Sequence, residues 1–439
     1  MEENQIFIPE GWAKQKGDNL FKVQGGYAFK SNDYKDEGVL LVRISNVGNN
    51  NFIYKDLIYV PKRFLTSHSN FLLDKDDVLM GLTGDLGKIC ILENGEFPFI
   101  LNQRVGRFIF NEKVSNRFLY YLISSSTIQN KFDAFFTGGA QKNISPKQIE
   151  SVEYVVPKST TEQTAIATIL SKTVQAIANT EALIAKYTRI KTGLMKDLLT
   201  KGIDENGNIR SEQSHEFKDS PLGRIPKEWE CEKLSDFCNE KYLGSVQTGP
   251  FGSQLHFSDY KNEGTPIITV EHLKNENISH QDLPLVGKED YIRLKKYNLI
   301  TGDLVFSRVG AIDRCSIVTE KENNWLFSGR CLRVRPGNQF NSEYLLRQMN
   351  FDFVRSQINN NAVGSTMKCL NTQILSDILI VKPKITEQER IVLLFNKSNE
   401  LISKIETELS KLQSLKTGLM QDLLSGKVRV NNLKMKRNE

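Results

Sequence analysis

Two long segments of the chain alternate apolar and polar residues with a helical period. Lys, Glu and Gln flank a single apolar stripe in residues 161–199 and again in residues 386–424. The pattern predicts two amphipathic helices, each about 58 Å long at a rise of 1.5 Å per residue. Thr161 and Thr386, just ahead of the stripes, are expected to cap them. The stripe positions are Ile166, Leu170, Ile177, Ile184, Tyr187 and Leu194, and Ile391, Phe395, Ile402, Ile405, Leu409, Leu412 and Leu419.

The two helical segments are copies of one another. TEQTAIATILSKTVQ, from position 161, matches TEQERIVLLFNKSNE, from position 386, and the register holds to IKTGLMKDLL (190–199) and LKTGLMQDLL (415–424). Gly193 and Gly418 lie inside these runs, where glycine costs roughly 1 kcal/mol relative to alanine. We expect them to allow close backbone approach, at the helix crossing or against a partner. Two matching stripes can bury each other, so the helices should pair, antiparallel if a pseudo-twofold axis relates the repeats, with a globular region at each end.

A fainter repeat precedes each helix. SNDYKDEG (31–38) matches FSDYKNEG (257–264), DVLMGLTGDLGK (77–88) matches DLVFSRVGAIDR (303–314), NQRVGR (102–107) matches SGRCLR (328–333), and IPEGW (8–12) echoes IPKEW (225–229). Short apolar runs between turn residues predict strands, with helices expected at 116–132 and 341–358. The predicted fold is α+β: two mixed α/β domains separated by two long helices that form an antiparallel coiled coil, in a pseudo-twofold tandem repeat.

This organisation predicts six parts. They are a first globular domain (1–158), a first spacer helix (159–200), a polar linker (201–224), a second globular domain (225–384), a second spacer helix (385–428) and a basic tail (429–439).

Composition limits the classes of protein that remain. Lys plus Arg number 58 against 52 Asp plus Glu, so the net charge of +6 permits a polyanionic partner without requiring one. The six cysteines form no CxxC pair, which argues against a disulfide framework or a zinc site. The polar, acidic start is unlike a signal peptide, and no apolar run reaches the roughly 20 residues that span a bilayer. We expect a cytoplasmic protein with no membrane association.

The sequence lacks the motifs of common enzymes. GLTGDLGKI (81–89) resembles a phosphate loop, but its spacing is wrong and Ile89 replaces the magnesium-binding Ser or Thr. GxSxG, HExxH, GxGxxG before a helix, and the Asn-Pro-Pro-aromatic tetrapeptide of amino-methyltransferases are all missing. We therefore expect a non-catalytic recognition chain with no catalytic residue and no metal ligand. The alternatives are a methyltransferase or nuclease with a decayed motif, or a coiled-coil scaffold with two protein-binding heads.

These repeated phrases resemble the specificity subunit of type I restriction-modification systems. The resemblance is carried by the two IPxxW openings, the two TEQ…LKTGLMxDLL helices and the linker phrase FKDSPLGRIPKEW (217–229). It implies that each globular domain reads one half of a bipartite target in double-stranded DNA. It also implies that the helices set the spacing and dock two methyltransferase subunits, through which restriction subunits join. S-adenosylmethionine, ATP and magnesium would belong to those partners, and this chain would bind no cofactor.

The candidate DNA contacts lie in the matched segments. Arg104 and Arg330 are equivalent, and arginine is the commonest bidentate reader of guanine; the alternative is an arginine that buttresses a strand. Glycine-rich loops 25–35 and 248–261 suit close approach to a groove, and the second resembles a PFGS loop that recurs in the family; the alternative is a plain surface turn. The full set is Lys30, Lys35, Lys88, Asn102, Gln103, Arg104, Lys142, Ser253, Gln254, Lys261, Arg308, Arg314, Ser328, Arg330 and Lys368. The candidate partner-binding residues are Lys191, Gly193, Lys416 and Gly418.

Overall fold

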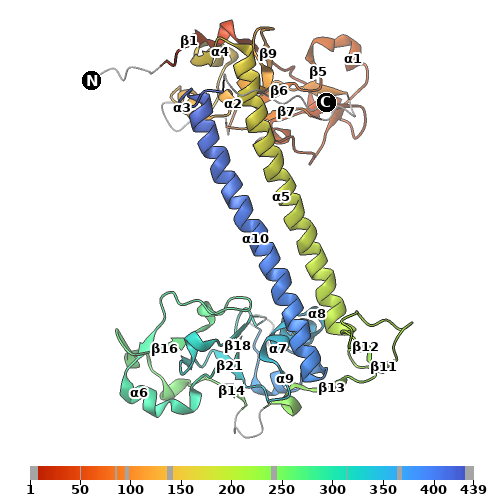
Figure 1. Cartoon of the computed structure of the whole chain (residues 1–439), viewed down its shortest axis with the longest axis vertical. Coiled ribbons are helices and arrows are strands. Elements are labelled where there is room, and N and C mark those ends of the chain that lie inside the picture. Colours follow the sequence, from red (N-terminus) through yellow and green to blue (C-terminus); the bar gives the residue numbers. More distant parts are fainter. Residues whose placement is uncertain are drawn as a thin grey trace. The chain divides into compact units, whose positions relative to one another are not determined.

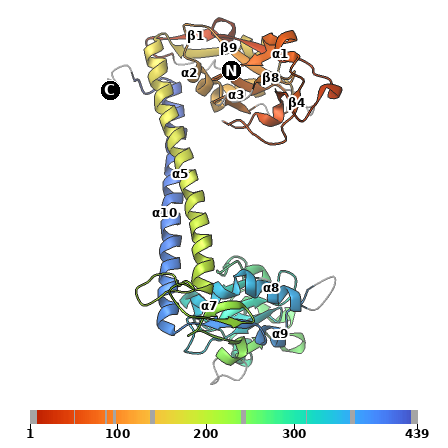
Figure 2. The same cartoon turned by 90° about the vertical axis from the view of Figure 1, so that its right-hand side faces the viewer.

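The computed structural model describes residues 8–49, 51–84, 87–93, 98–135, 142–238, 245–312, 314–362 and 368–430. Contacts divide the chain into two units, each described by itself below. The first unit combines residues 1–183 with 405–439, and the second comprises residues 184–404. Figures 1 and 2 show the elements of both units in two views. None of the described helices is long and apolar enough to cross a membrane.

The first unit contains two four-stranded sheets and a two-stranded ribbon. The strand orders are β2-β9-β6-β7 and β4-β3-β8-β5, and β1 pairs with β10. All pairs are antiparallel except β3 with β8. The strands are β1 (Trp12–Lys16), β2 (Phe21–Gly25), β3 (Val39–Val42), β4 (Tyr59–Val60), β5 (Leu72–Leu73), β6 (Val78–Gly81), β7 (Ile89–Ile91), β8 (Phe99–Leu101), β9 (Val105–Phe110) and β10 (Glu153–Pro157), and the short helices are α1 (Phe64–Ser67), α2 (Asn116–Ile123), α3 (Ser126–Asp133) and α4 (Pro146–Ser151).

Alternate residues of the central strands enter different cores of this unit. Val78 and Met80 of β6 pack in the core that includes helices α2, α3 and α4, whereas Leu79 packs with Leu40 and Val42 of β3 in the core between the two sheets. Strands buried on both faces need continuous apolar runs instead of alternating ones, which explains runs such as GVLLV. The sheet β2-β9-β6-β7 is therefore a central layer, covered by helices on one face and by the other sheet on the opposite face.

The second unit repeats this plan. Its four-stranded sheets have the orders β14-β21-β18-β19 and β15-β17-β16-β20, and the ribbon pairs β13 with β22. Pairing of β16 with β20 is parallel, as in the equivalent pair of the first unit. A hairpin, β11-β12, precedes the ribbon. The strands are β11 (Phe217–Ser220), β12 (Gly223–Pro226), β13 (Glu230–Lys233), β14 (Val246–Thr248), β15 (Tyr260–Lys261), β16 (Thr265–Ile268), β17 (Leu285–Val286), β18 (Leu304–Ser307), β19 (Cys315–Ile317), β20 (Leu326–Phe327), β21 (Cys331–Val334) and β22 (Leu379–Lys382), and the short helices are α6 (Lys288–Arg293), α7 (Ser342–Met349), α8 (Asp352–Asn361) and α9 (Thr372–Ser376).

The long helices, α5 (Thr160–Thr200) and α10 (Ile385–Leu424), contribute to both units. In the first unit, Ile166 and Leu170 near the start of α5 share a core with Leu423 and Leu424 at the end of α10. In the second unit the end of α5 packs on the start of α10: Leu198 and Leu199 share a core with Ile391, Val392 and Phe395. The start of one helix thus lies beside the end of the other in each unit, which confirms the antiparallel pairing (Figure 1).

The helix boundaries correct three expectations. Thr161 and Thr386 are not caps, because both lie inside the first turn; the Ser159 hydroxyl instead accepts a hydrogen bond from the Glu162 amide at 3.4 Å. The helix expected at 116–132 is two helices, since α2 ends where the Ser125 hydroxyl bonds the Leu122 carbonyl at 2.6 Å. The helix expected at 341–358 is likewise divided into α7 and α8.

The glutamines of the two TEQ phrases have a structural role that the sequence did not suggest. The side-chain amide of Gln163 donates from Nε2 to the Pro157 carbonyl at 2.8 Å. Its Oε1 accepts from the backbone N–H of Ser115 at 2.9 Å. Gln388 makes the equivalent bonds, to the Pro383 carbonyl at 2.9 Å and from the Asn341 amide at 2.8 Å. Each glutamine is buried. Each therefore ties the start of a long helix to the preceding strand and to the start of a short helix.

The glycines in the repeated phrase are not explained by the helix crossing. A Cβ atom added to Gly193 or Gly418 would meet no described atom within 4 Å. Close approach of the two helices therefore does not require glycine at either position. Of the two expected explanations, contact with a partner remains a prediction.

Candidate nucleic-acid interface

Four chain segments converge at one edge of the central sheet in the first unit. The loop after β2 passes directly over the turn between β8 and β9, where the Tyr27 amide donates to the Leu101 carbonyl and the Gln103 amide donates to the Tyr27 carbonyl, both at 3.0 Å. A Cβ on Gly26 would come within 2.3 Å of the Asn102 carbonyl oxygen. Only glycine fits this crossing, so Gly26 fixes how the loop and the turn are joined.

The other two segments join through the loop that follows β6. The Leu82 amide donates to the Arg104 carbonyl at 3.0 Å, and the Gly84 amide donates to the Lys142 carbonyl at 2.7 Å. The Ile144 amide returns a bond to the Leu82 carbonyl at 2.9 Å. Tyr27, Arg104 and Lys142 therefore lie along one hydrogen-bonded edge, although Tyr27 and Lys142 are more than a hundred positions apart in the sequence.

The second unit builds an equivalent edge with different side chains. The Gly249 amide donates to the Cys331 carbonyl at 3.2 Å, and a Cβ on Gly249 would lie 2.2 Å from the Ser328 carbonyl oxygen. The Arg308 amide donates to the Arg330 carbonyl at 2.9 Å, and the Leu370 amide donates to the Arg308 carbonyl at 2.8 Å. The loop, the turn and the two further segments of the first unit all have counterparts here.

Arg104 and Arg330 occupy the same place in the two edges. Arg104 is the second residue of the tight turn before β9, and Arg330 is the second residue of the tight turn before β21. Both side chains are exposed. Neither guanidinium has a hydrogen-bonding or ionic partner among the residues that the structure describes. Arg308 is different: it is half-buried, and its guanidinium bonds the Thr248 hydroxyl at 3.4 Å and the Gly329 carbonyl at 3.3 Å and lies 5.7 Å from the centre of the Phe251 ring. Arg308 therefore shapes the edge, whereas Arg104 and Arg330 project from it.

The remaining predicted DNA contacts divide by burial and position. Asn102 and Ser328 are buried, which favours strand packing over base contact for their side chains. Lys35 and Lys261 are exposed but extend from the second sheet of each unit, next to β4 and in β15. The exposed candidates are Lys30, Lys35, Gln103, Arg104, Lys142, Gln254, Lys261, Arg330 and Lys368, and the half-buried ones are Lys88, Arg308 and Arg314. The Ser253 side chain lies outside the described part of the chain, as do Asp85 and Leu86 of the phosphate-loop-like phrase.

Several of these side chains already have protein partners. The Lys142 ammonium lies 2.6 Å from the Asp133 carboxylate, and the Lys368 ammonium bonds the Asn359 carbonyl at 3.3 Å. Gln254 accepts a bond from the Tyr297 hydroxyl at 2.5 Å. The exposed ion pair of Lys142 with Asp133 is exchangeable for contact with a ligand, because exposed ion pairs contribute little stability.

The predicted partner-binding residues lie on the long helices. Lys191 and Lys416 are half-buried, and burial lowers the pKa of Lys416 while the charge of Glu181 opposes that effect. Beside them, Ile190 and Leu415 are 50% and 52% exposed and occupy the same position of the repeated phrase. The phrase thus displays an equivalent exposed apolar side chain in each unit, which the sequence analysis did not single out.

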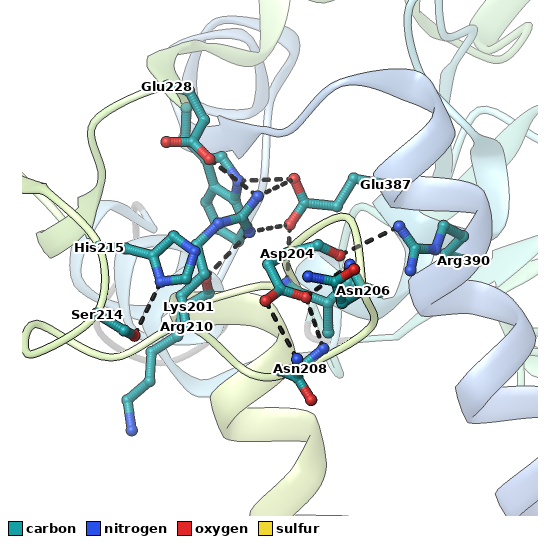
Figure 3. Close-up of polar contacts among 12 residues, drawn as sticks. Lys201, Asp204, Asn206, Asn208, Arg210, Ser214, His215, Glu228, Glu387 and Arg390 are labelled. Atoms are coloured by element: carbon teal, nitrogen blue, oxygen red, sulfur yellow. Dashed lines mark hydrogen bonds and ion pairs between the residues drawn. The ribbon is translucent and has the colours of Figure 1, made fainter.

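A buried ion pair holds the start of α10 in the second unit (Figure 3). The two terminal guanidinium nitrogens of Arg210, Nη1 and Nη2, bond the Glu387 carboxylate at 2.5 and 3.2 Å, and that carboxylate also accepts from the Trp229 indole at 3.2 Å and the Ile203 amide at 2.9 Å. Burial would lower the pKa of Arg210, but its hydrogen bond to Glu387 and the charges of Glu387, Glu228 and Asp204 together more than offset burial, so the pKa is raised. We call this group the second clamp. Gly202 makes room for it with a φ of +64°.

A first clamp holds the start of α5 in the first unit. Arg429, which follows the end of α10, bonds the Glu162 carboxylate at 2.7 and 3.0 Å and reaches the Glu10 carbonyl. Glu162 and Glu387 are the glutamates of the two TEQ phrases. The units differ at the tryptophan, because the Trp12 indole N–H is buried without a partner among the described atoms, whereas that of Trp229 bonds Glu387.

Neither clamp was predicted from the sequence. The repeated glutamate and the repeated IPxxW tryptophan were visible, but the arginines follow the two helices at different distances and in different phrases. No three His, Cys, Asp or Glu side chains of the described ranges gather as metal ligands would.

Comparisons with known proteins agree with this architecture. The profile described as type I restriction modification DNA specificity domain matches residues 9–189 and again residues 226–414. The MjaVIII specificity subunit of Methanocaldococcus jannaschii is 30% identical over 155 residues, which span 34% of this chain and 36% of that protein. The EcoKI specificity subunit of Escherichia coli is 21% identical over 442 residues, covering 96% of this chain and 90% of that subunit.

A solved structure shares the fold. The type I restriction-modification S subunit from M. genitalium superposes with a TM-score of 0.53 at 15% identity, covering 96% of this chain and 97% of that one. The two profile matches together span most of the chain, and each covers one globular region with most of the long helix that follows it. The chain therefore belongs to the DNA specificity subunits of type I restriction-modification systems.

Proposed function

We propose that the chain reads a bipartite DNA target, one half with each globular region, while the helix pair fixes the distance between the halves. The observation that supports this is the pair of equivalent edges, in which one set of backbone connections carries different side chains. Arg104 and Arg330 are common to both, but Gln103 stands where Gly329 does, and Tyr27 belongs to a loop whose counterpart contains Phe251. Base readout depends on side chains, so one scaffold with two surfaces suits two different half-sites.

The target motif itself provides the first test. We expect the host genome to carry methylation at a motif with two specific halves, and we expect that methylation to disappear when this gene is deleted and to return when it is restored. Long-read sequencing of native DNA measures it. An unchanged methylation pattern in the deletion strain would contradict the proposal. Methyl transfer from S-adenosylmethionine by the purified chain alone would favour a decayed methyltransferase instead.

We also infer that the repeated helix phrase docks two methyltransferase subunits, through which restriction subunits join, in the cytoplasm. Ile190 with Gly193, and Leu415 with Gly418, form one small apolar patch displayed twice. Identical subunits need identical surfaces, and a duplicated patch supplies them. S-adenosylmethionine, ATP and magnesium would be held by those partners.

Changing one patch at a time should remove one partner at a time. Ile190→Asp and Leu415→Asp should each weaken one methyltransferase contact by roughly tenfold or more, the effect of losing a central apolar anchor. Native mass spectrometry would then show complexes with one methyltransferase subunit for each single variant and none for the double variant. Leu183→Asp is the matched control, because Leu183 is 39% exposed on α5 outside the repeated phrase. Full two-subunit complexes in the double variant would exclude these patches as docking sites.

A further inference from the structure

Phe257 projects from the second unit more fully than any other large apolar side chain in the described ranges. It is 91% exposed, and the next most exposed, Ile292, is 62% exposed. Phe257 lies in the loop that contains the candidate contacts Gln254 and Lys261. In the matched phrase of the first unit its position is occupied by Ser31. An aromatic ring left in water forgoes about 2 kcal/mol of burial, which contact with a ligand would recover.

Hydrogen bonds brace the loop that carries the Phe257 ring. The Asp259 carboxylate accepts a bond from the His256 amide at 2.9 Å, which closes the short helical turn Phe257–Asp259. Arg293 of α6 bonds that carboxylate at 3.2 Å and the Gln254 carbonyl at 2.5 Å, so it joins both sides of the tip. The Phe257 and Tyr260 rings lie nearly perpendicular, with centroids 6.0 Å apart and an interplanar angle of 87°, and the Phe257 side chain stays 91% exposed.

A lysine ammonium lies close to the tip, and two acidic side chains near it are engaged by an arginine. The Lys261 ammonium lies 3.4 Å from the Ser258 carbonyl, next to Phe257 in the chain. The carboxylates of Asp259 in the loop and Asp290 in α6 are both paired with Arg293. Phe257 lies six positions after Phe251, whose ring lies under Arg308 at the edge described above. That length of chain spans at most about 20 Å, so one DNA half-site can meet both the tip and Arg330.

We propose that Phe257 is an apolar wedge that inserts between stacked base pairs in the half-site read by the second unit. This rests on the proposed DNA-reading function and adds a mode of contact to it. Insertion of an apolar side chain partly unstacks a base step and kinks the duplex, and surrounding cations hold the bent backbone. Readout by a wedge depends on how easily a step opens, and pyrimidine–purine steps open most easily. The first unit, with Ser31 at this position, reads its half-site without a wedge.

The test uses the complete complex and the motif found methylated in the wild-type strain. Duplexes with 2-aminopurine at successive positions of that motif report unstacking by a rise in fluorescence. We expect a rise at one step of one half-site with wild type, its loss in Phe257→Ser, and roughly tenfold weaker binding, the usual effect when an aromatic ring loses contact with a base. Phe257→Leu, which keeps an apolar wedge, should retain most of both effects.

Ser31→Ala is the matched control at the equivalent position and should change neither signal. Because Phe257 is almost fully exposed, these variants should fold normally, which hydrogen exchange of the second unit would verify. Equal binding and an equal fluorescence rise with Phe257→Ser would overturn the wedge while leaving the proposed function intact. Weaker binding without a rise at any position in wild type would also overturn insertion. Absence of motif-specific binding by wild type would count against the proposed function itself.

Discussion

Replacing Glu387 with alanine is expected to lower the free energy of unfolding of the second unit by about 3–5 kcal/mol, the usual loss when one partner of a buried ion pair is removed. Arg210 is 6% exposed, and of the carboxylates in the described ranges it would keep Glu228 in an ion pair, at 2.9 Å. The Trp229 indole and the Ile203 amide would lose their acceptor at the same time. Hydrogen exchange should rise in residues 201–210 and 385–395 and stay unchanged in residues 9–16.

Three variants give this prediction its controls. Glu389→Ala removes an exposed carboxylate two positions away and should have little effect. Glu162→Ala should reverse the pattern by loosening the first unit alone, because its partner is Arg429. Arg210→Met combined with Glu387→Leu should recover much of the stability, since no unpaired charge is then buried. Equal loosening of both units by Glu387→Ala would contradict a clamp confined to one unit.

Replacing Arg330 with alanine is expected to relax the reading of one half-site by about 1–3 kcal/mol at a single base pair, the range for loss of a bidentate base contact. Its side chain is exposed on a turn whose backbone is fixed by the Arg308 amide, so the substitution should remove a contact without moving the scaffold. Methylome sequencing of a strain that carries this variant should show one half of the motif degenerate at one position and the other half unchanged.

Arg104→Ala is the natural counterpart and should relax the other half of the motif only. If both arginines contact phosphate, each variant would instead weaken binding to all sequences alike and reduce its dependence on salt. Arg308→Ala should behave differently from either, because that side chain holds Gly329 and Phe251 in place. A motif unchanged in both halves would show that neither arginine reads a base.

The fold was largely predictable because the sequence contains an internal repeat of its main elements. An ungapped repeat of an amphipathic phrase requires two similar helices, and each stripe needs a partner of the same length, so antiparallel pairing follows from symmetry. Local detail was less accessible. Residues 116–132 can be read as one helix, although the SSST run at 124–127 favours caps and turns. In the structure α2 ends at Ile123, and the Ser125 hydroxyl bonds the Leu122 carbonyl. Thr161 looked like a cap because threonine often is one, but Ser159 takes that place.

In the candidate site, only residues in matched positions of the two repeats could be predicted from the sequence. Equivalent positions such as Arg104 and Arg330 could be paired from sequence, and the structure places them on equivalent turns. The clamps could not be found that way, because Arg210 and Glu387 are 177 positions apart and Arg429 and Glu162 are 267 apart. Contact between such residues depends on where the tertiary structure brings the chain after each helix, and no spacing rule encodes it.

The division of the two units along the chain bears on the order in which they form during synthesis. The second unit is one continuous stretch, residues 184–404, and can close as soon as the ribosome has released it. The first unit needs Leu423, Leu424 and Arg429 to complete its core and its clamp. Domains generally fold as their residues emerge, so the half of the protein translated first is finished last, and its apolar surface waits for the carboxyl-terminal residues to cover it.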